Sequence, residues 1–296
     1  MHHNLTTYCV MIKISTPVSA GPMEARISLE DKIMVLGSCF ADGIGSRLRD
    51  GGFDACINPF GTLYNPVSIC NSIARLESGL PFREAECVEM GAGAGLICSF
   101  SHHTSFARPT KEAFLANANA SLSEASAFWK SCNKVIVSLG TAMVWKREKN
   151  GEVVSNCLKR PASEFTHEML GVTHIFALLQ LLVSSHRGKQ FIFTVSPIRH
   201  LGDGAHANTL SKATLQLSLA KVQADYFPAY EILLDELRDY RYYADDLVHP
   251  SKLAEDIIWQ RFLDCAVESA DLPQVALNEK AARRSAHRPI HQVSEV

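Results

Sequence analysis

The 296-residue sequence has no dense block of Lys or Arg and no large excess of charge of one sign. Lys and Arg together number 29 and Asp and Glu number 31, which gives a formal net charge of -2 at pH 7. Proteins that bind duplex nucleic acid or an anionic membrane surface usually concentrate positive charge in one segment or on one face. The sequence therefore argues against nucleic acid and membranes as partners and favours a small molecule.

The sequence also lacks the cysteine patterns of disulfide frameworks and zinc sites. Its nine cysteines are odd in number and are never spaced as C-x-x-C. Small disulfide-bonded domains usually carry an even set of cysteines, and structural zinc sites usually use closely spaced pairs. We therefore expect free thiols in a reducing, cytoplasmic compartment, and we expect neither a metal nor another cofactor.

No hydrophobic run is long enough to cross a bilayer. The longest apolar stretch, Ile175 to Val183, is interrupted by Gln180 and is far shorter than the roughly 20 residues that a membrane span needs. Met1 to Ile14 lacks the cationic start, apolar core and cleavage site of a secretory leader. These absences favour a soluble protein and leave its oligomeric state open.

What the sequence does contain is an alternation of strand-like and helix-like segments. Apolar runs such as 32–36, 134–139 and 190–195 lack the period-two pattern of half-exposed strands, which is typical of parallel strands covered on both faces. The sequence predicts an α/β fold with one domain over residues 1–270 and a disordered tail over 271–296. We expect helices near 40–50, 67–77, 110–129, 166–185, 207–224 and 251–268, short strands at 53–57 and 96–100, a hairpin joining 144–146 to 153–155, and either a strand or a helix at 231–234.

Two short motifs contain the residues that we expect to be catalytic. Ser38 follows the first predicted strand with only Gly37 between them, and Asp246 precedes His249 by three residues near the end of the domain. A serine hydroxyl is a weak nucleophile that needs an imidazole to accept its proton and a carboxylate to orient that imidazole. Residues three apart can point the same way. The sequence therefore predicts a Ser38, His249 and Asp246 triad.

Each of these residues also has a structural interpretation. Serine commonly caps helices, so Ser38 is also expected as an N-cap. Asp246 and His249 are also consistent with a capping loop before the last helix, and Asp245 is an alternative carboxylate. Cys39 is a rival nucleophile, although its neighbours place it in the first turn of the helix.

The run Gly37-Ser38-Cys39-Phe40-Ala41 is similar to the motif that names the GSCFA family, which resembles a branch of the SGNH (GDSL-like) hydrolase superfamily. This resemblance covers roughly residues 15–265. It implies a flavodoxin-like, three-layer α/β/α fold with a mainly parallel sheet, Ser38 as nucleophile, and Asp246 and His249 as its partners. It extends to Asn58-Pro59-Phe60-Gly61-Thr62, Leu139-Gly140-Thr141-Ala142, Thr194-Val195-Ser196-Pro197 and Asp246-Leu247-Val248-His249-Pro250-Ser251.

The superfamily also implies three donors to the oxyanion. We expect these from the Ser38 amide, from Gly61 and from Thr141, which adjoins Ala142 where the superfamily has Asn. Loss of one oxyanion donor typically costs on the order of 10² to 10³ in rate. Asn156 is an alternative third donor, so weak or specialised activity is consistent with this departure.

Other polar residues lie in predicted loops at the site. We expect Asn58, Asn156 and Arg199 to contact the substrate, with Arg199 or its neighbour His200 meeting an anionic or sugar group or else stabilising the loop. His102 and His103 favour a solvated loop over a metal site, because no third ligand lies at a useful spacing. Trp145 is either a stacking surface or part of the core.

Two functions are consistent with these features. The first is a serine-dependent hydrolase of ester bonds, an esterase, deacetylase or acyltransferase acting on a carbohydrate or a small acyl ester through an acyl-Ser38 intermediate. The preference for deacetylation rests on superfamily analogy alone. The alternative is a ligand-binding or regulatory protein on the same fold with little turnover, which Ala142 suggests.

Overall fold

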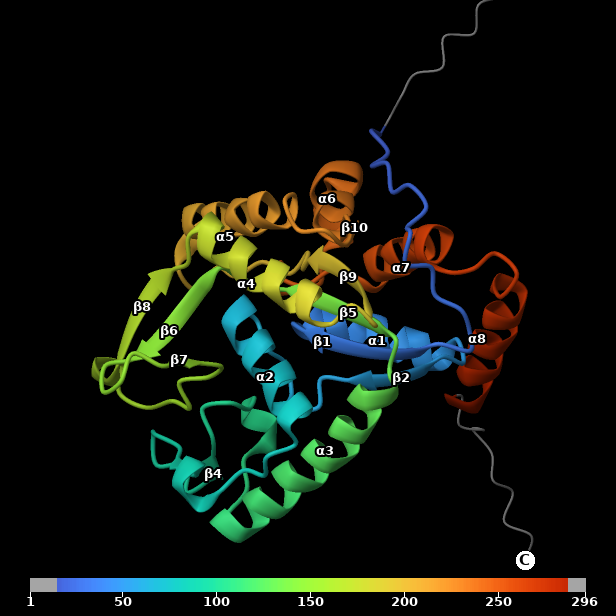
Figure 1. Cartoon of the computed structure of the whole chain (residues 1–296). Coiled ribbons are helices and arrows are strands. Elements are labelled where there is room, and N and C mark those ends of the chain that lie inside the picture. Colours follow the sequence, from blue (N-terminus) through green and yellow to red (C-terminus); the bar gives the residue numbers. More distant parts are fainter. Residues whose placement is uncertain (1–14, 287–296) are drawn as a thin grey trace, which may run out of the picture.

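Five apolar strands form the centre of the structure, a computed structural model that describes residues 15–286 (Figure 1). They are all parallel and lie in the order β10-β9-β5-β1-β2. The expected features of Met1 to Ile14 and of residues 287–296 lie outside the described residues. The strands are β1 (Lys32–Gly37), β2 (Asp54–Ile57), β5 (Lys134–Leu139), β9 (Gln190–Val195) and β10 (Asp225–Phe227).

The strand order places the site. Numbered along the chain from the β2 edge, the five strands run 2-1-3-4-5, which is the flavodoxin-like order. In such sheets ligands bind at the carboxyl ends of the strands, where the order reverses. That reversal lies between β1 and β5, directly beyond Gly37 and Leu139.

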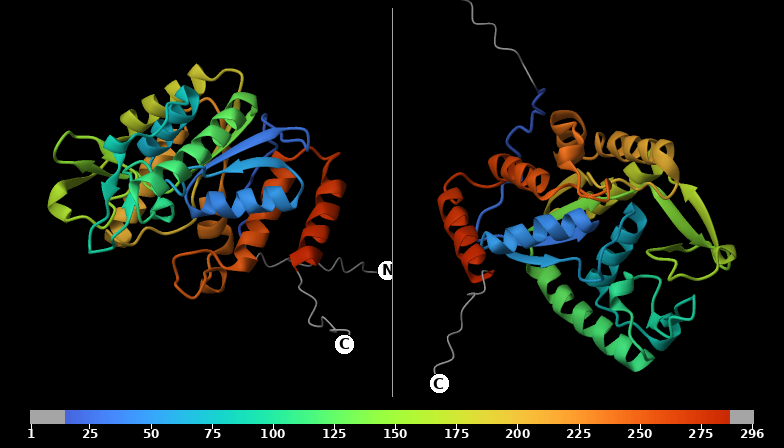
Figure 2. Two further views of the ribbon diagram at one scale, coloured as in Figure 1. Left: turned by 90° about the horizontal axis from the view of Figure 1, so that it is seen from below. Right: turned by 180° about the vertical axis from the view of Figure 1, so that it is seen from behind.

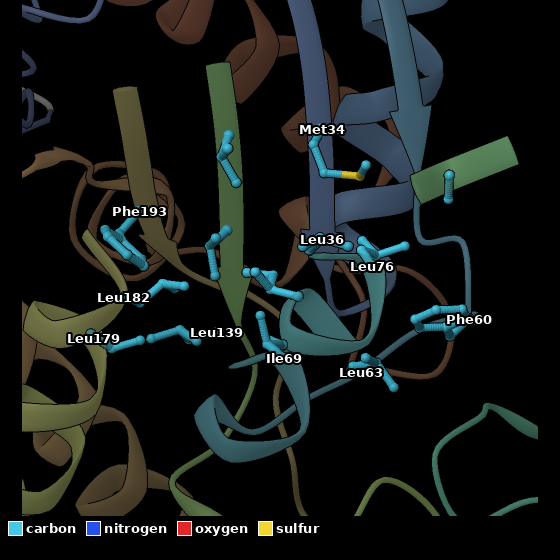
Figure 3. Packing of buried hydrophobic residues seen from close by; sticks show 14 of the residues in the cluster. Met34, Leu36, Phe60, Leu63, Ile69, Leu76, Leu139, Leu179, Leu182 and Phe193 are labelled. Carbon is cyan, nitrogen blue, oxygen red and sulfur yellow. The ribbon is translucent and has the colours of Figure 1, made fainter. Parts of the chain in front are cut away.

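Helices cover both faces of the sheet, as the apolar strand runs predict. Alternate residues of a strand point to opposite faces, so Met34 and Leu36 join one buried cluster while Ile33 and Val35 join the other. The first cluster packs under α2 (Pro66–Ser78), α3 (Lys111–Ser131), α4 (Val172–Ser185) and α5 (Gly204–Leu219), as Figure 3 shows in part. The second packs under α1 (Cys39–Asp50), α6 (Ala229–Glu231), α7 (Lys252–Ala266) and α8 (Leu272–Ala286). The architecture is consistent with three α/β/α layers.

A small antiparallel sheet stands beside the carboxyl ends of the central strands (Figure 1). It consists of β6 (Met143–Arg147), β7 (Val153–Val154) and β8 (Phe165–Met169), in the order β7-β6-β8. The predicted hairpin is confirmed as β6 and β7. The helix predicted over 166–185 begins only at Val172, because residues 165–169 pair with β6 and Gly171 is the N-cap of α4.

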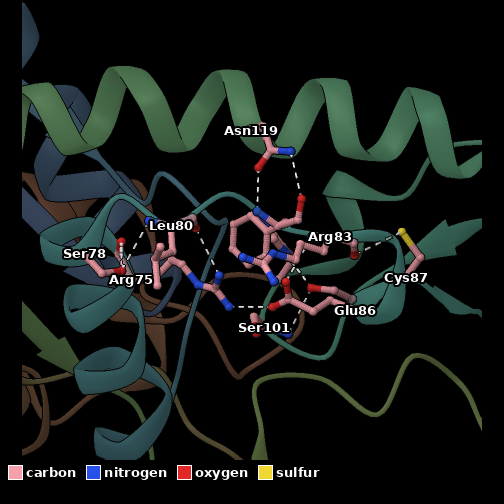
Figure 4. A network of polar contacts seen from close by, with 11 residues as sticks. Arg75, Ser78, Leu80, Arg83, Glu86, Cys87, Ser101 and Asn119 are labelled. Carbon is pink, nitrogen blue, oxygen red and sulfur yellow. Dashed lines mark hydrogen bonds and ion pairs between the residues drawn. The ribbon is translucent and has the colours of Figure 1, made fainter.

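A long connection between α2 and α3 is held by polar contacts (Figure 4). Arg75 of α2 forms an ion pair with Glu86 at 2.5 Å and donates to Leu80 O at 3.0 Å. Asn119 of α3 accepts from the N–H of Phe82 and donates to its carbonyl, at 2.7 and 3.0 Å. These bonds tie the connection to both helices. It contains the short pair β3 (Val88–Glu89) and β4 (Ile97–Cys98), the latter shorter than the strand predicted at 96–100.

The C-terminal part of the chain is more ordered than its sequence suggests. Residues 272–286 of the predicted disordered tail form α8, which lies beside α1 (Figure 2). Val275 is buried, Asn278 donates to Gly51 O at 2.8 Å, and Glu279 accepts from the indole N–H of Trp259 at 2.6 Å. One buried apolar residue and two polar contacts are too few to give a clear period in the sequence.

Residues 225–237 show which of the two structures predicted for 231–234, a strand or a helix, is formed. The segment 231–234 is helical, and the last strand is instead β10, which pairs with β9. A π-helical turn, Ile232–Leu237, follows α6. Within residues 15–286, no helix combines the length and the apolar character that a bilayer crossing requires.

Candidate active site

The turn after β1 brings the chain unusually close to β5. Gly37 has φ +137°, and a Cβ there would lie 2.1 Å from Ser138 O. Only glycine fits at this distance. The Gly37 N–H donates to Asn58 Oδ1 at 2.8 Å and the Ser38 N–H donates to Ser138 O at 3.1 Å. These bonds fix the start of α1 at the carboxyl end of the sheet.

Ser38 is the N-cap of α1 and is fully buried. Its Oγ accepts from the Phe40 N–H at 3.3 Å and shares a hydrogen bond with Ser138 Oγ at 3.1 Å. Ser138 lies on the α1 face of β5, beside Ile136, which packs in the cluster under α1 and α7. The hydroxyl predicted as the nucleophile therefore points under α1.

Cys39 is the first residue of α1 and is half-buried. Its Sγ lies 3.5 Å from the hydroxyl of Tyr64, and its side chain lines the cavity described below. The first N–H groups of a helix have no acceptor within the helix and attract negative charge. The thiol is thus placed where a helix favours an anion.

Asp246 and His249 form the pair that the D-x-x-H spacing predicts. Asp246 Oδ2 lies 2.6 Å from His249 Nδ1, and Asp246 Oδ1 accepts from the N–H groups of Val248 and His249, both at 2.9 Å. These hydrogen bonds lower the pKa of Asp246 to about 2. Because an ionised carboxylate only accepts, Nδ1 carries the proton and Nε2 is the nitrogen that can act as a base.

A cavity of about 600 Å³ lies between the carboxyl ends of the central strands and the small antiparallel sheet. Its wall is mostly apolar, and Cys39 and His249 both line it. Ser38 and Asp246 do not line it. The cavity therefore brings together a thiol and the imidazole of a His–Asp pair from segments 210 residues apart (249 − 39). Its other lining residues include Tyr64, Thr141, Trp145, His167 and His200.

A family model for the GSCFA family matches residues 32–262, which is most of the chain. The chain belongs to the GSCFA family. Comparisons with curated proteins and with solved structures give no match. The matched range begins at β1 and ends within α7, so it contains Cys39, the Asp246–His249 pair and all five central strands.

The backbone N–H groups predicted as oxyanion donors are already used in this GSCFA chain. Each donates to a carbonyl of the protein, so the folded structure does not offer it to a substrate. Thr141 Oγ1 is also occupied, since it bonds Ser211 Oγ at 2.9 Å. The three backbone bonds run from Ser38 N to Ser138 O (3.1 Å), from Gly61 N to Asn58 O (2.8 Å) and from Thr141 N to Tyr64 O (3.0 Å).

The three predicted substrate contacts lie in different places. Asn156 and Arg199 line the cavity, whereas Asn58 does not. Arg199 donates from its N–H to Val248 O at 3.2 Å and from Nη1 to Leu247 O at 3.1 Å, so it also supports the loop that carries His249. Asn156 Oδ1 accepts from the Leu158 N–H at 2.7 Å.

Asn58 is held inside the protein. It is buried and has a φ of +41°. Its Oδ1 accepts a hydrogen bond from the Gly37 N–H, and its Nδ2 donates to Asp42 at 2.6 Å.

Asn58→Ala leaves both partners without these bonds, and an unsatisfied buried group costs about 1–3 kcal/mol. We expect a loss of that size in the free energy of unfolding by urea titration. Asn71→Ala, at an exposed position of α2, is the control and is expected to change little. An equal effect of both variants would contradict this role of Asn58.

Tyr64 and His200 are site residues that the sequence did not single out for these roles. Tyr64 lies two residues after the Asn58-Pro59-Phe60-Gly61-Thr62 motif, and its hydroxyl bonds Thr62 Oγ1 at 3.1 Å as well as Cys39 Sγ. Burial raises its pKa to about 12, so it remains a donor at neutral pH. His200 packs edge-on against Tyr64, and its buried Nε2 has no partner among the described residues. Burial and the nearby charges of Lys212 and His249 lower its pKa to about 4.

The remaining polar residues of interest divide between core and cavity. His102 is buried against the rings of Phe60, Phe82, Phe106 and Phe114, and its Nδ1 bonds Ser99 Oγ at 2.6 Å. This explains why it does not lie in a solvated loop as expected. Trp145 lines the cavity and stacks on His167 with ring centroids 3.9 Å apart.

Proposed function

We propose that this GSCFA protein is a hydrolase of acyl esters, or an acyltransferase, that works through a covalent acyl-enzyme. The proposal rests on the Asp246–His249 pair, in which Asp246 Oδ2 lies 2.6 Å from His249 Nδ1. His249 lines a cavity that is also lined by Cys39 from the first turn of α1. His249 is the general base, and Asp246 fixes its tautomer and stabilises the imidazolium. The nucleophile comes from the start of α1, where the sequence predicts Ser38.

The developing negative charge on the substrate needs donors other than the predicted ones. The hydroxyl of Tyr64 and the backbone N–H of Cys39 are the groups at the cavity that suit this role, because the neighbouring N–H groups of Ser38, Phe40 and Ala41 already donate to protein acceptors. Tyr64 is suited because its raised pKa keeps the proton on its oxygen at neutral pH. Both groups lie on the side of the cavity that holds Cys39.

The cavity wall supports a substrate with an apolar part. Met143, Trp145 and Phe165 of the small sheet form one side, while Asn156, Arg199 and Asp203 supply polar groups. An acyl group against the apolar side and a small alcohol or sugar at the polar groups fit this division. The resemblance to SGNH hydrolases supports the same class by analogy.

A ligand-binding protein without turnover is the second candidate. The occupied N–H groups of Ser38, Gly61 and Thr141 favour it, because they leave the usual type of oxyanion hole unformed. Ala142 is buried and its own N–H donates to Ser211 Oγ at 2.7 Å, so it does not replace them.

One experiment separates the two candidates. The purified protein is mixed with 4-nitrophenyl acetate or 4-nitrophenyl butyrate, and the release of nitrophenolate is followed. The mass of the intact protein in quenched samples is then measured by mass spectrometry. The enzyme predicts a burst of nitrophenolate and a protein heavier by one acyl group. A binding protein predicts no adduct but a rise in melting temperature with the esters or with acetylated sugars. Absence of both adduct and turnover would contradict the proposed enzyme.

A further inference from the structure

We infer that the nucleophile of this site is the thiol of Cys39 and that the hydroxyl of Ser38 serves only to cap α1. The inference rests on the proposed acyl-transfer function and adds to it the atom that carries the acyl group. Four observations lead to it: the contacts of Ser38, the position of Cys39, the position of the Asp246–His249 pair and the surroundings of the other cysteines.

Ser38 is committed to the fold. Its Oγ accepts a hydrogen bond from the N–H of Phe40 and shares one with the hydroxyl of Ser138, and the residue has no exposed surface. To reach the cavity, this oxygen would have to leave both partners and uncap a helix, which destabilises the helix. Within residues 15–286, no hydrogen bond joins His249 to Ser38 or to Cys39, and of these two residues only Cys39 lines the cavity that His249 lines. The serine is therefore placed to hold the turn and not to attack a substrate.

Cys39 occupies the place that a nucleophile needs. It is the next residue, so its side chain leaves the backbone in a different direction and reaches the cavity that His249 lines. The Tyr64 hydroxyl, 3.5 Å from Sγ, supplies a hydrogen-bond donor to a thiolate. An imidazole and a helix N-terminus are the surroundings that activate cysteine nucleophiles. Because Cys39 and His249 line the same cavity, we place this cysteine with His249 and Asp246 in the proposed catalytic set.

The second thiol at the cavity differs in its surroundings. Cys157 also lines the cavity, but burial raises its pKa to about 11, which keeps it protonated and unreactive at neutral pH. It lies in the connection after β7, directly before a turn at residues 158–159. Burial likewise raises the pKa of Cys56 to about 11 and that of Cys70 to about 12. Cys157 is the internal comparison for any reagent that enters the cavity.

The chemistry of the step is balanced without a further reactant. His249 Nε2 takes the proton of Cys39, Sγ bonds the carbonyl carbon of the ester, and the carbon–oxygen bond breaks as the imidazolium returns the proton to the leaving alcohol. Water or an acceptor hydroxyl then gives its proton to Nε2 and attacks the thioester. The carbon–sulfur bond breaks, and the released thiolate regains the proton from His249.

The test locates the acyl group and compares adjacent variants. Wild type, Cys39→Ala, Cys39→Ser, Ser38→Ala and Ser38→Gly are acylated with 4-nitrophenyl acetate, quenched in acid and digested for peptide mass spectrometry. We expect the acetyl group on Cys39, no adduct in Cys39→Ala, and a fall in turnover on the order of 10³-fold or more for that variant. Both Ser38 variants are expected to keep the adduct. Ser38→Gly serves if Ser38→Ala is unstable, because glycine is tolerated at N-caps.

A second readout does not depend on finding a good substrate. Iodoacetamide is expected to alkylate Cys39 at least about 10-fold faster than Cys157, and His249→Ala is expected to slow the alkylation of Cys39 while leaving the rate of Cys157 unchanged. Cys87→Ser, which alters a cysteine outside the cavity, is the matched control and should leave the Cys39 rate unchanged. Equal alkylation of Cys39 and Cys157 in wild type would contradict the inference.

The outcomes distinguish this inference from the proposed function. An acetyl group on Ser38, or full turnover by folded Cys39→Ala with loss in Ser38→Gly, overturns the thiol assignment and leaves the hydrolase standing. Turnover that survives His249→Ala and gives no adduct on either residue overturns both. Circular dichroism of every variant confirms that the compared proteins are folded.

Discussion

Replacing His249 with alanine is expected to lower kcat/KM for a 4-nitrophenyl ester by about 10³ to 10⁴-fold, or roughly 4–5.5 kcal/mol in the activation free energy. His249 is the cavity imidazole that Asp246 orients, and its removal leaves the nucleophile without a proton acceptor. His174→Ala, at an exposed position in the first turn of α4, is the control and should keep wild-type rates.

The same pair makes a prediction about pH. Asp246 has its pKa lowered to about 2 by the N–H groups of His249 and Val248 and by the His249 ring, so it stays ionised at any pH above about 4. Any loss of activity on acidification above that pH therefore does not come from protonation of Asp246. Asp246→Asn removes the acceptor for Nδ1–H and is expected to lower kcat more than it raises KM. A His249→Ala variant with wild-type kcat/KM would contradict the role of this residue.

The strands and the His–Asp pair could be predicted because they depend on local sequence. The runs at 134–139 and 190–195 match β5 and β9, and a three-residue spacing suffices to bring Asp246 to His249. The face reached by each residue at the start of α1 could not be predicted in this way. Ser38 and Cys39 are adjacent, and only the close approach of Gly37 to β5 decides which of them points under the helix.

Long-range pairing explains the other differences. Residues 165–169 have apolar neighbours on the C-terminal side that favour a helix, yet they become β8 because β6 offers an edge to pair with. The predicted oxyanion N–H groups are lost to carbonyls of Asn58, Tyr64 and Ser138, which no spacing rule reveals. In each case the partner lies in a segment whose position is set by the whole fold.

Lys212 is a buried cation beneath the same end of the sheet. Its Nζ donates to Gly140 O and Ser196 O, both at 2.7 Å, just past β5 and β9. Only 1% of its surface is exposed, and its hydrogen-bond acceptors among residues 15–286 are these two carbonyls and no carboxylate. Burial lowers its pKa from 10.5 to about 7. The ammonium bridges the two strand ends but lacks the solvation that a charge requires.

We expect the free energy of unfolding to rise with pH through this lysine. Above pH 7 the folded protein has released a proton that the unfolded chain still binds until about pH 10.5, so unfolding takes up a proton and is opposed as pH rises. The gain between about pH 7 and pH 9.5 is on the order of 3 kcal/mol. His200 contributes little there, since its pKa of about 4 and its ordinary value of 6.5 both lie below this window. The thiols of Cys56, Cys70 and Cys157, whose pKa burial raises from 9 to about 11 or 12, oppose the rise in the upper part of the window, so the Lys212 contribution is measured as a difference between wild type and a Lys212 variant.

Urea titrations at several pH values test this expectation. Lys212→Met removes the ammonium while keeping most of the side-chain volume, and the unfolding free energy of wild type minus that of this variant should increase by about 3 kcal/mol between about pH 7 and pH 9.5. Lys221→Met, at an exposed position beyond α5, should keep the wild-type slope. Parallel pH profiles for wild type and Lys212→Met would show that Lys212 titrates at its ordinary pKa. In that case the two carbonyls and the neighbouring dipoles stabilise the ammonium as well as water does.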